Sequence, residues 1–114
     1  MNIAQLSPAP ARHETFKRNR HRFVPAGPGC YVLTTFSCEV LYIGLSVNLR
    51  RRLNDHLDNP EKTAETCIGR AVLFHWLEVE GRELNKIERT WLNTHIQHEG
   101  KIPILNKIFS PTTA

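Results

Sequence analysis

A chain of 114 residues, 40% hydrophobic and 23% charged, has the length and composition of one globular domain. No apolar run is long enough to span a membrane, and the N-terminus lacks a basic start followed by an apolar block, so neither a transmembrane helix nor a secretory signal is indicated. We expect a cytoplasmic protein without a membrane partner. Its three cysteines match neither a disulfide framework nor a zinc site and are expected as free thiols.

The positive charge lies mainly in the first half of the chain. The net charge is +4, with a pI of about 9.3. Through Leu57, eight Lys and Arg residues face three Asp and Glu, whereas from Asp58 onward seven face eight. This bias suits a phosphate backbone, although a moderately basic pI is also common among proteins that bind no nucleic acid.

Residues 1–28 are expected to form a leader, with a basic segment that is either a short helix or an arm. Phe16 and Phe23 would anchor it to the body of the domain, and the prolines at 25 and 28 end it. Its cations either contact phosphates or only keep the leader soluble. These cations are Lys17, Arg18, Arg20 and Arg22.

The stretch from Gly29 to Leu45 predicts a β-hairpin. Residues 29–35 and 39–45 are rich in Tyr, Val, Ile, Leu and Thr, and the connection between them is too short for anything but an antiparallel return. With the turn centred on Phe36 and Ser37, Tyr31 is predicted to lie directly across from Tyr42. The two phenols would share one face, either as an ordinary aromatic pair or as part of a site.

A helix is predicted after the hairpin, with Ser46 as its N-cap and a core-facing stripe of leucines at 45, 49, 53 and 57. Asn48, Arg52 and His56 form the neighbouring polar stripe. Of the three consecutive arginines, Arg50 and Arg51 would face solvent or phosphate, and Arg52 lies closest to the core edge.

The remainder of the chain predicts a polar loop over 59–69, a strand over 71–80 and a helix over 82–98 closed by Gly100. His75 and His95 are expected to be structural. Glu88 falls near the centre of the apolar face of this last helix, where an isolated charge costs several kcal/mol. Either a salt bridge to Arg52 or a bound metal ion would explain it.

These residues resemble the GIY-YIG nuclease family. Gly29-Cys30-Tyr31 and Tyr42-Ile43-Gly44 stand for the two triplets, with a cysteine in place of the first isoleucine, and the Asn, Arg and His of the following helix match as well. Family members carry their metal-binding glutamate in a later helix, ahead of a Pro-x-x-Asn segment, which Glu88 and Pro103 to Asn106 match. The resemblance covers residues 29–109 and leaves the leader and a tail at 110–114 outside it.

The resemblance implies an α/β (α+β) fold, with a three-stranded, mainly antiparallel sheet flanked by helices in the order β-β-α-β-α. It also implies an endonuclease that needs one Mg²⁺ or Mn²⁺ ion and hydrolyses DNA to 3′-hydroxyl and 5′-phosphate ends, as in DNA repair, recombination, restriction or mobile introns. Glu88 would be the only protein ligand of the metal. Tyr31 would be the general base, Tyr42 an orienting group and Arg52 a phosphate ligand.

His56 would be a proton relay, and Asn106 would brace the site. Three readings stay open: a nuclease, a nucleic-acid-binding module of the same fold that does not cleave, and a structural or interaction domain. Neither the DNA target nor the oligomeric state follows from the sequence. A partner protein or domain could supply targeting. Nucleic-acid contacts are expected from Lys17, Arg18, Arg20, Arg22, Asn48, Arg50 and Arg51.

Overall fold

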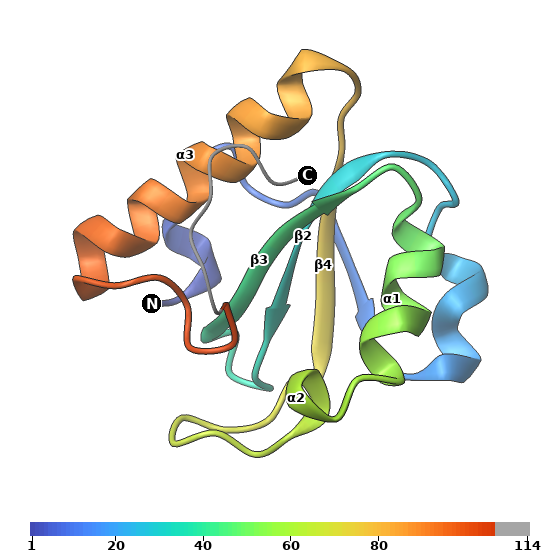
Figure 1. Ribbon diagram of the computed structural model, residues 1–114, viewed down its shortest axis with the longest axis horizontal. Coiled ribbons are helices and arrows are strands. Elements are labelled where there is room, and N and C mark those ends of the chain that lie inside the picture. Colours follow the sequence, from blue (N-terminus) through green and yellow to red (C-terminus); the bar gives the residue numbers. More distant parts are fainter. Residues whose placement is uncertain (107–114) are drawn as a thin grey trace.

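Four antiparallel strands form one sheet, with α1 against one face and α3 against the other (Figure 1). A computed structural model describes residues 1–106 of the chain. The strands are β1 (Arg12–Thr15), β2 (Gly29–Thr34), β3 (Val40–Ser46) and β4 (Leu73–Glu78), in the spatial order β1-β4-β2-β3. The helices are α1 (Leu49–Leu57), α2 (Pro60–Thr63) and α3 (Arg82–Glu99), with 3₁₀ turns η1 (Ile3–Gln5) and η2 (Arg18–Phe23).

The antiparallel sheet with flanking helices confirms the predicted fold class, but the predicted count of three strands is wrong. Residues 12–15, expected within a helix or arm, form β1 and pair with β4 from Arg12↔Trp76 to Thr15↔Leu73. Phe16 directly after β1 is buried, as predicted, whereas Phe23 is 47% exposed and anchors nothing in the core. The leader thus contributes a strand to the sheet, and the predicted tail at 110–114 lies outside the described residues.

Alternation along the strands gives the sheet two buried faces. One face carries Tyr31, Leu33, Phe74 and Trp76 and packs against the leucines of α1. The opposite face packs against Trp91 and other apolar residues of α3. The residues of this second face are Cys30, Val32, Ile43 and Leu45, joined by Met1 and Leu6 from the N-terminal segment.

Helix α1 begins later than predicted. Its N-cap is Asn48, whose side-chain oxygen accepts a hydrogen bond from the backbone N–H of Arg51 at 3.0 Å. Ser46 is still in β3, and its hydroxyl instead accepts a bond from the N–H of Asn48. Leu45 accordingly faces α3 from the strand and does not belong to the leucine stripe of α1. Leu49 and Leu53 of that stripe are fully buried, as predicted.

The prediction for α3 is confirmed nearly to the residue. It ends at Gly100, whose φ of 78° places it in the left-handed region that glycine adopts without strain. His95 is buried, with its Nδ1 2.7 Å from the carbonyl oxygen of Lys101. His75 is also buried, with its Nε2 2.9 Å from the hydroxyl of Thr34. Both histidines are structural, as expected.

Candidate active site

The two tyrosines share one face of the sheet but are not direct partners. Tyr31 lies opposite Gly44, and Tyr42 lies opposite Leu33, so the predicted Tyr31–Tyr42 register is wrong by two residues. Cys38, with φ of 68°, lengthens the turn, and an irregularity between Leu33 and Thr34 adds the second residue. A shift of two preserves the face, so the rings still stack diagonally with centroids 5.9 Å apart.

Gly44 makes room for this diagonal stack. A β-carbon at this position would lie 2.7 Å from the Tyr31 hydroxyl oxygen and 2.8 Å from a ring carbon of Tyr42. Both distances are shorter than any real contact between such atoms. The glycine of the second triplet is therefore required by the close approach of the two phenols, and a side chain there would push them apart.

His56 joins the two tyrosines from the last turn of α1. Its Nε2 is 2.6 Å from the hydroxyl oxygen of Tyr31, and its ring lies edge-on to Tyr42 with centroids 5.1 Å apart. Burial, aided by the charges of Lys62 and Arg52, lowers the pKa of His56 to about 3. The imidazole that faces Tyr31 is therefore neutral at physiological pH, with one nitrogen that donates a hydrogen bond and one that accepts.

The two phenols differ in access to solvent. Tyr31 is completely buried, and Tyr42 is only partly buried. Burial raises the pKa of both hydroxyls. The neighbouring Tyr31 and the charge of Arg52 act against burial and lower the pKa of Tyr42, whereas the neighbouring Tyr42 raises the pKa of Tyr31 further.

Arg52 lies one helical turn before His56 and borders both phenols. Its charge lowers the pKa of each tyrosine against the effect of burial. Its side chain is 30% exposed, and its Nε is 3.9 Å from a carboxylate oxygen of Asp55. At that distance the ion pair holds the guanidinium only loosely, so the donors of Arg52 remain available to an anion at this edge.

Glu88 approaches the same edge from the opposite face of the sheet. It lies partly buried on α3, and its charge raises the pKa of Tyr42. Burial, and secondly the charge of Glu88, raise the pKa of the Cys30 thiol to about 12. Burial raises the pKa of Glu88 itself to about 7, with Arg89 opposing weakly. Within residues 1–106, Glu88 makes no ion pair with Arg52 or any other side chain, which removes the salt-bridge explanation.

The donor set at this edge fits a hard divalent cation with few protein ligands. No three His, Cys, Asp or Glu side chains of the described residues converge, so a cation at Glu88 would have few ligands among them. Mg²⁺ keeps several waters and commonly takes one or two carboxylates together with substrate phosphates. A cation would also offset the partly desolvated charge of Glu88, which makes no ion pair within residues 1–106. The residues present therefore fit the metal that the sequence led us to expect.

Asn106 braces the exposed edge of β3. Its side-chain oxygen accepts a bond from the N–H of Ile43 at 3.0 Å, and its amide nitrogen donates to the carbonyl of the same residue at 2.9 Å. Both polar groups of the amide are thus committed to the strand between Tyr42 and Gly44. Asn106 positions this strand and is not available as a metal ligand.

Lys62 is the site residue that the sequence reasoning missed. It lies in α2, within the segment predicted as a polar loop, yet its side chain is only 8% exposed. Its ammonium nitrogen sits 4.8 Å from the centroid of the Tyr42 ring. No spacing in the sequence links Lys62 to the tyrosines, because the turn after α1 brings it back over the site.

Four of the seven predicted nucleic-acid ligands have side chains that already form ion pairs or hydrogen bonds with the protein. Arg18 pairs with Asp58, and Arg20 pairs with Glu14 at 2.8 Å. Asn48 caps α1, and Arg50 donates to the carbonyl of Val24 at 2.8 Å. The other three side chains are exposed and make no ion pair within residues 1–106; they are Lys17, Arg22 and Arg51.

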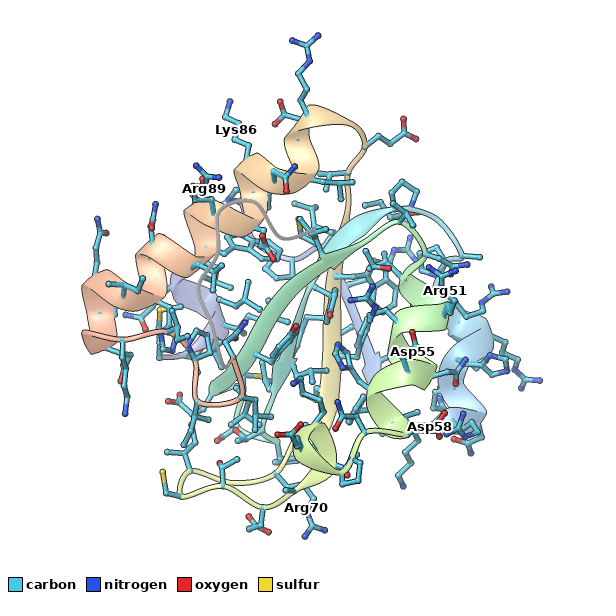
Figure 2. The ribbon with its side chains drawn as sticks, viewed as in Figure 1. Arg51, Asp55, Asp58, Arg70, Lys86 and Arg89 are labelled. Carbon is cyan, nitrogen blue, oxygen red and sulfur yellow. The ribbon has the colours of Figure 1, made fainter. Side chains whose placement is uncertain are left out.

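Further cations flank the β3 edge. Figure 2 shows Arg51 on α1 to one side of β3, and Lys86 and Arg89 on α3 to the other side. The tyrosines belong to β2 and β3 between these flanks, and Arg52 and Glu88 belong to α1 and α3 themselves. Positive charge on both sides of the β3 edge would attract a polyanion and increase its rate of association.

No helix among residues 1–106 is long and apolar enough to cross a membrane.

The family model described as the GIY-YIG catalytic domain matches residues 27–101, which is more than half of the chain. A comparison with curated proteins finds no match. The matched segment contains both tyrosine triplets, α1 and Glu88, while β1, η2 and Asn106 lie outside it.

Proposed function

The chain belongs to the GIY-YIG family, a family of nucleases, and from this premise we propose that it is a divalent-metal-dependent DNA endonuclease leaving 3′-hydroxyl and 5′-phosphate ends. The observation that carries the proposal is one edge of the sheet. There, two stacked phenols, a neutral histidine and an arginine lie together, and Glu88 on the other face is near enough for its charge to raise the pKa of Tyr42. Hydrolysis of a phosphodiester needs a base for water and cations for the phosphoryl oxygens, and this edge offers both.

Glu88 is the proposed ligand of one Mg²⁺ or Mn²⁺ ion. When bound, such an ion neutralises charge on the scissile phosphate and on the leaving oxygen. Arg52 donates to the phosphoryl oxygens from the other side of the site, with planar donors that a lysine cannot reproduce. Support comes from the partly buried carboxylate, which makes no ion pair within residues 1–106, and from the partly exposed guanidinium close to both phenols.

We assign the general base to Tyr42, whereas the sequence suggested Tyr31. A base must contact the attacking water, and the Tyr31 hydroxyl is completely buried against His56. Tyr31, held by His56, lowers the pKa of the neighbouring Tyr42 and so favours a phenolate there. Arg52 stabilises the same phenolate. Tyr31 and His56 thus act through Tyr42.

Duplex DNA would lie against the β3 edge, with phosphates on the cations that flank it. Arg51 and Lys17 from the predicted set, and Lys86 and Arg89 on α3, are exposed on the described surface. Arg18, Arg20, Asn48 and Arg50 already have protein partners, so we propose a structural role for those contacts and only a secondary one on DNA.

Single-turnover cleavage of a labelled duplex, with and without EDTA, tests the proposal. Tyr42→Phe should slow cleavage by about two to four orders of magnitude, since general-base catalysis contributes that much. Tyr31→Phe should slow it less, because water can partly replace an orienting hydroxyl. Both changes leave the rings, and therefore DNA binding and folding, intact.

Three outcomes would overturn parts of this picture. Cleavage that persists in EDTA would show that the reaction needs no divalent metal. A Tyr42→Phe variant that cleaves like the parent, beside a Tyr31→Phe variant that does not, returns the base to Tyr31. DNA binding without cleavage under any metal would favour a binding module that keeps the fold.

A further inference from the structure

A depression near the start of α1 is lined by none of the candidate active-site residues. It has a volume of about 310 Å³ between η2, the first turn of α1 and the ends of β1 and β4. A neighbouring hollow of about 390 Å³ continues along β1 and shares Arg12, Phe23 and Trp76 with it. Arg12, Phe23 and all of η2 precede the segment that the family model matches, whereas Arg50, Trp76 and Glu78 lie within it, so the family match covers only part of this lining.

Phe23 gives this groove an aromatic wall that packing does not explain. It is 47% exposed, although Phe16 of the same segment is buried in the core. The guanidinium carbons of Arg20 and Arg22 lie 4.6 and 5.0 Å from the centroid of its ring. The two guanidinium groups lie over this partly exposed ring, and unpaired nucleobases stack both on aromatic rings and on guanidinium planes.

The charge of the groove suits phosphate. Arg12, Arg22 and Arg50 line it, against the single carboxylate of Glu78. Neither Arg12 nor Arg22 makes an ion pair within residues 1–106. Arg50 is held by the carbonyls of Val24 at 2.8 Å and Arg22 at 3.4 Å, which orients its guanidinium but leaves it without a carboxylate. The lining therefore keeps an excess of positive charge.

The groove and the candidate active site lie on the same side of the sheet. Trp76 contacts Phe74, with ring centroids 6.1 Å apart, and Phe74 stacks on Tyr31 at 5.1 Å. Trp76 belongs to β4, beside the edge strand β1, while the tyrosines belong to β2 and β3 (Figure 1). Helix α1 packs on this face of the sheet through Leu49 and Leu53, so a strand that occupies the groove would pass around α1 to reach the tyrosines.

We propose that this groove binds a single-stranded segment that flanks the cleavage site. An unpaired base stacks on Phe23 beside Trp76, and the neighbouring phosphates contact Arg12, Arg22 and Arg50. Paired bases have both faces covered by their neighbours and cannot enter, so the groove selects DNA with an unpaired flank over a continuous duplex. This inference rests on the proposed nuclease function for the position of the cut, but not for the binding itself.

Binding is tested on the full chain carrying Glu88→Gln, which prevents cleavage, by fluorescence anisotropy of a labelled oligothymidine and of a blunt duplex. Phe23→Ala should weaken oligothymidine binding about tenfold or more, since stacking of one base is worth that much, and should change duplex binding less than twofold. Phe36→Ala is the matched control, because Phe36 is 83% exposed at the hairpin turn, away from the groove. It should change neither affinity.

Two further measurements separate the groove from the catalytic proposal. Bound oligothymidine should quench the fluorescence of the groove residue Trp76 in the parent, and Phe23→Ala should remove this quenching. In the cleaving protein, a duplex with a single-stranded flap should be cut faster than a blunt duplex, and Phe23→Ala should abolish the difference.

Equal oligothymidine affinities for the Phe23→Ala and Phe36→Ala variants would overturn the groove while leaving the nuclease proposal intact. Binding and quenching that depend on Phe23, in a protein that cleaves no DNA, would support the groove and overturn the nuclease proposal. Loss of oligothymidine and duplex binding to the same extent would also overturn the groove, because it would show general loss of charge or fold.

Discussion

Replacing Glu88 by Gln should abolish cleavage and, in the absence of metal, stabilise the protein. The carboxyl has a pKa of about 7 in the folded chain against an ordinary value of 4.5, because burial penalises its charge. A difference of this size corresponds to about 3 kcal/mol as an upper limit. Since the side chain is only partly buried, solvent reduces the expected gain to about 1–2 kcal/mol.

The sign of the effect depends on pH. Because folding raises the pKa, the folded state holds its proton more tightly than the unfolded state, and stability is lost as pH rises from 4.5 to about 7. Urea unfolding in EDTA should therefore show equal stability of parent and Glu88→Gln at pH 4, and a more stable variant at pH 8. Mg²⁺ at pH 8 should stabilise the parent and leave the variant unchanged, because a ligand stabilises only the state that binds it.

Glu83→Gln is the matched control, since Glu83 is an exposed glutamate in the first turn of the same helix. Its stability should differ from that of the parent by a few tenths of a kcal/mol at both pH values, in line with ordinary surface changes. A Glu88→Gln protein that is less stable than the parent at pH 8 in EDTA would refute the reasoning, because the carboxylate would then be a favourable partner of some group. Residual cleavage by a folded variant would refute its role as the metal ligand.

Gly44→Ala should reduce cleavage by at least a hundredfold in single-turnover assays, because its β-carbon would lie 2.7 Å from a phenol oxygen and push the tyrosines apart. Arg52→Lys should slow cleavage while circular dichroism shows an unchanged fold, since the charge stays and the forked donors are lost. Asn106→Ala should lower the free energy of unfolding by about 1–3 kcal/mol, because two backbone groups of Ile43 lose their partner. Deleting residues 1–22 should unfold the protein, as judged by circular dichroism, because β1 and its buried neighbour Phe16 are removed.

The sequence was sufficient for the parts of the fold that depend on periodicity. Alternation predicted the hairpin and the shared face of Tyr31 and Tyr42, which survives a register shift of two. The four-residue repeat predicted the buried face of α1, and the apolar stripe with Gly100 predicted α3 and its end. These features are local, so a window of the chain contains all the information that they require.

The errors concern features that only tertiary contacts decide. The positive φ of Cys38 and the irregularity near Leu33 set the hairpin register, and neither residue type announces them. The short, charged strand β1 exists because β4 offers a free edge, which local propensity cannot foresee. Lys62 reaches Tyr42 through a turn whose path depends on packing. The proposal of Tyr42 over Tyr31 as the general base depends on the complete burial of Tyr31, which no pattern in the sequence predicts.

The placement of the site on an edge strand explains the role of Asn106. The proposed catalytic groups come from both faces of the sheet and can meet only around the open side of β3, so no further strand can pair there without covering them. Open edges, however, invite pairing with other chains. Asn106 donates to and accepts from Ile43 as a neighbouring strand would, and the N–H of Leu105 bonds the carbonyl of Leu41 at 2.9 Å. The edge is thereby satisfied by a short segment that leaves Tyr42 accessible, which a full strand would not.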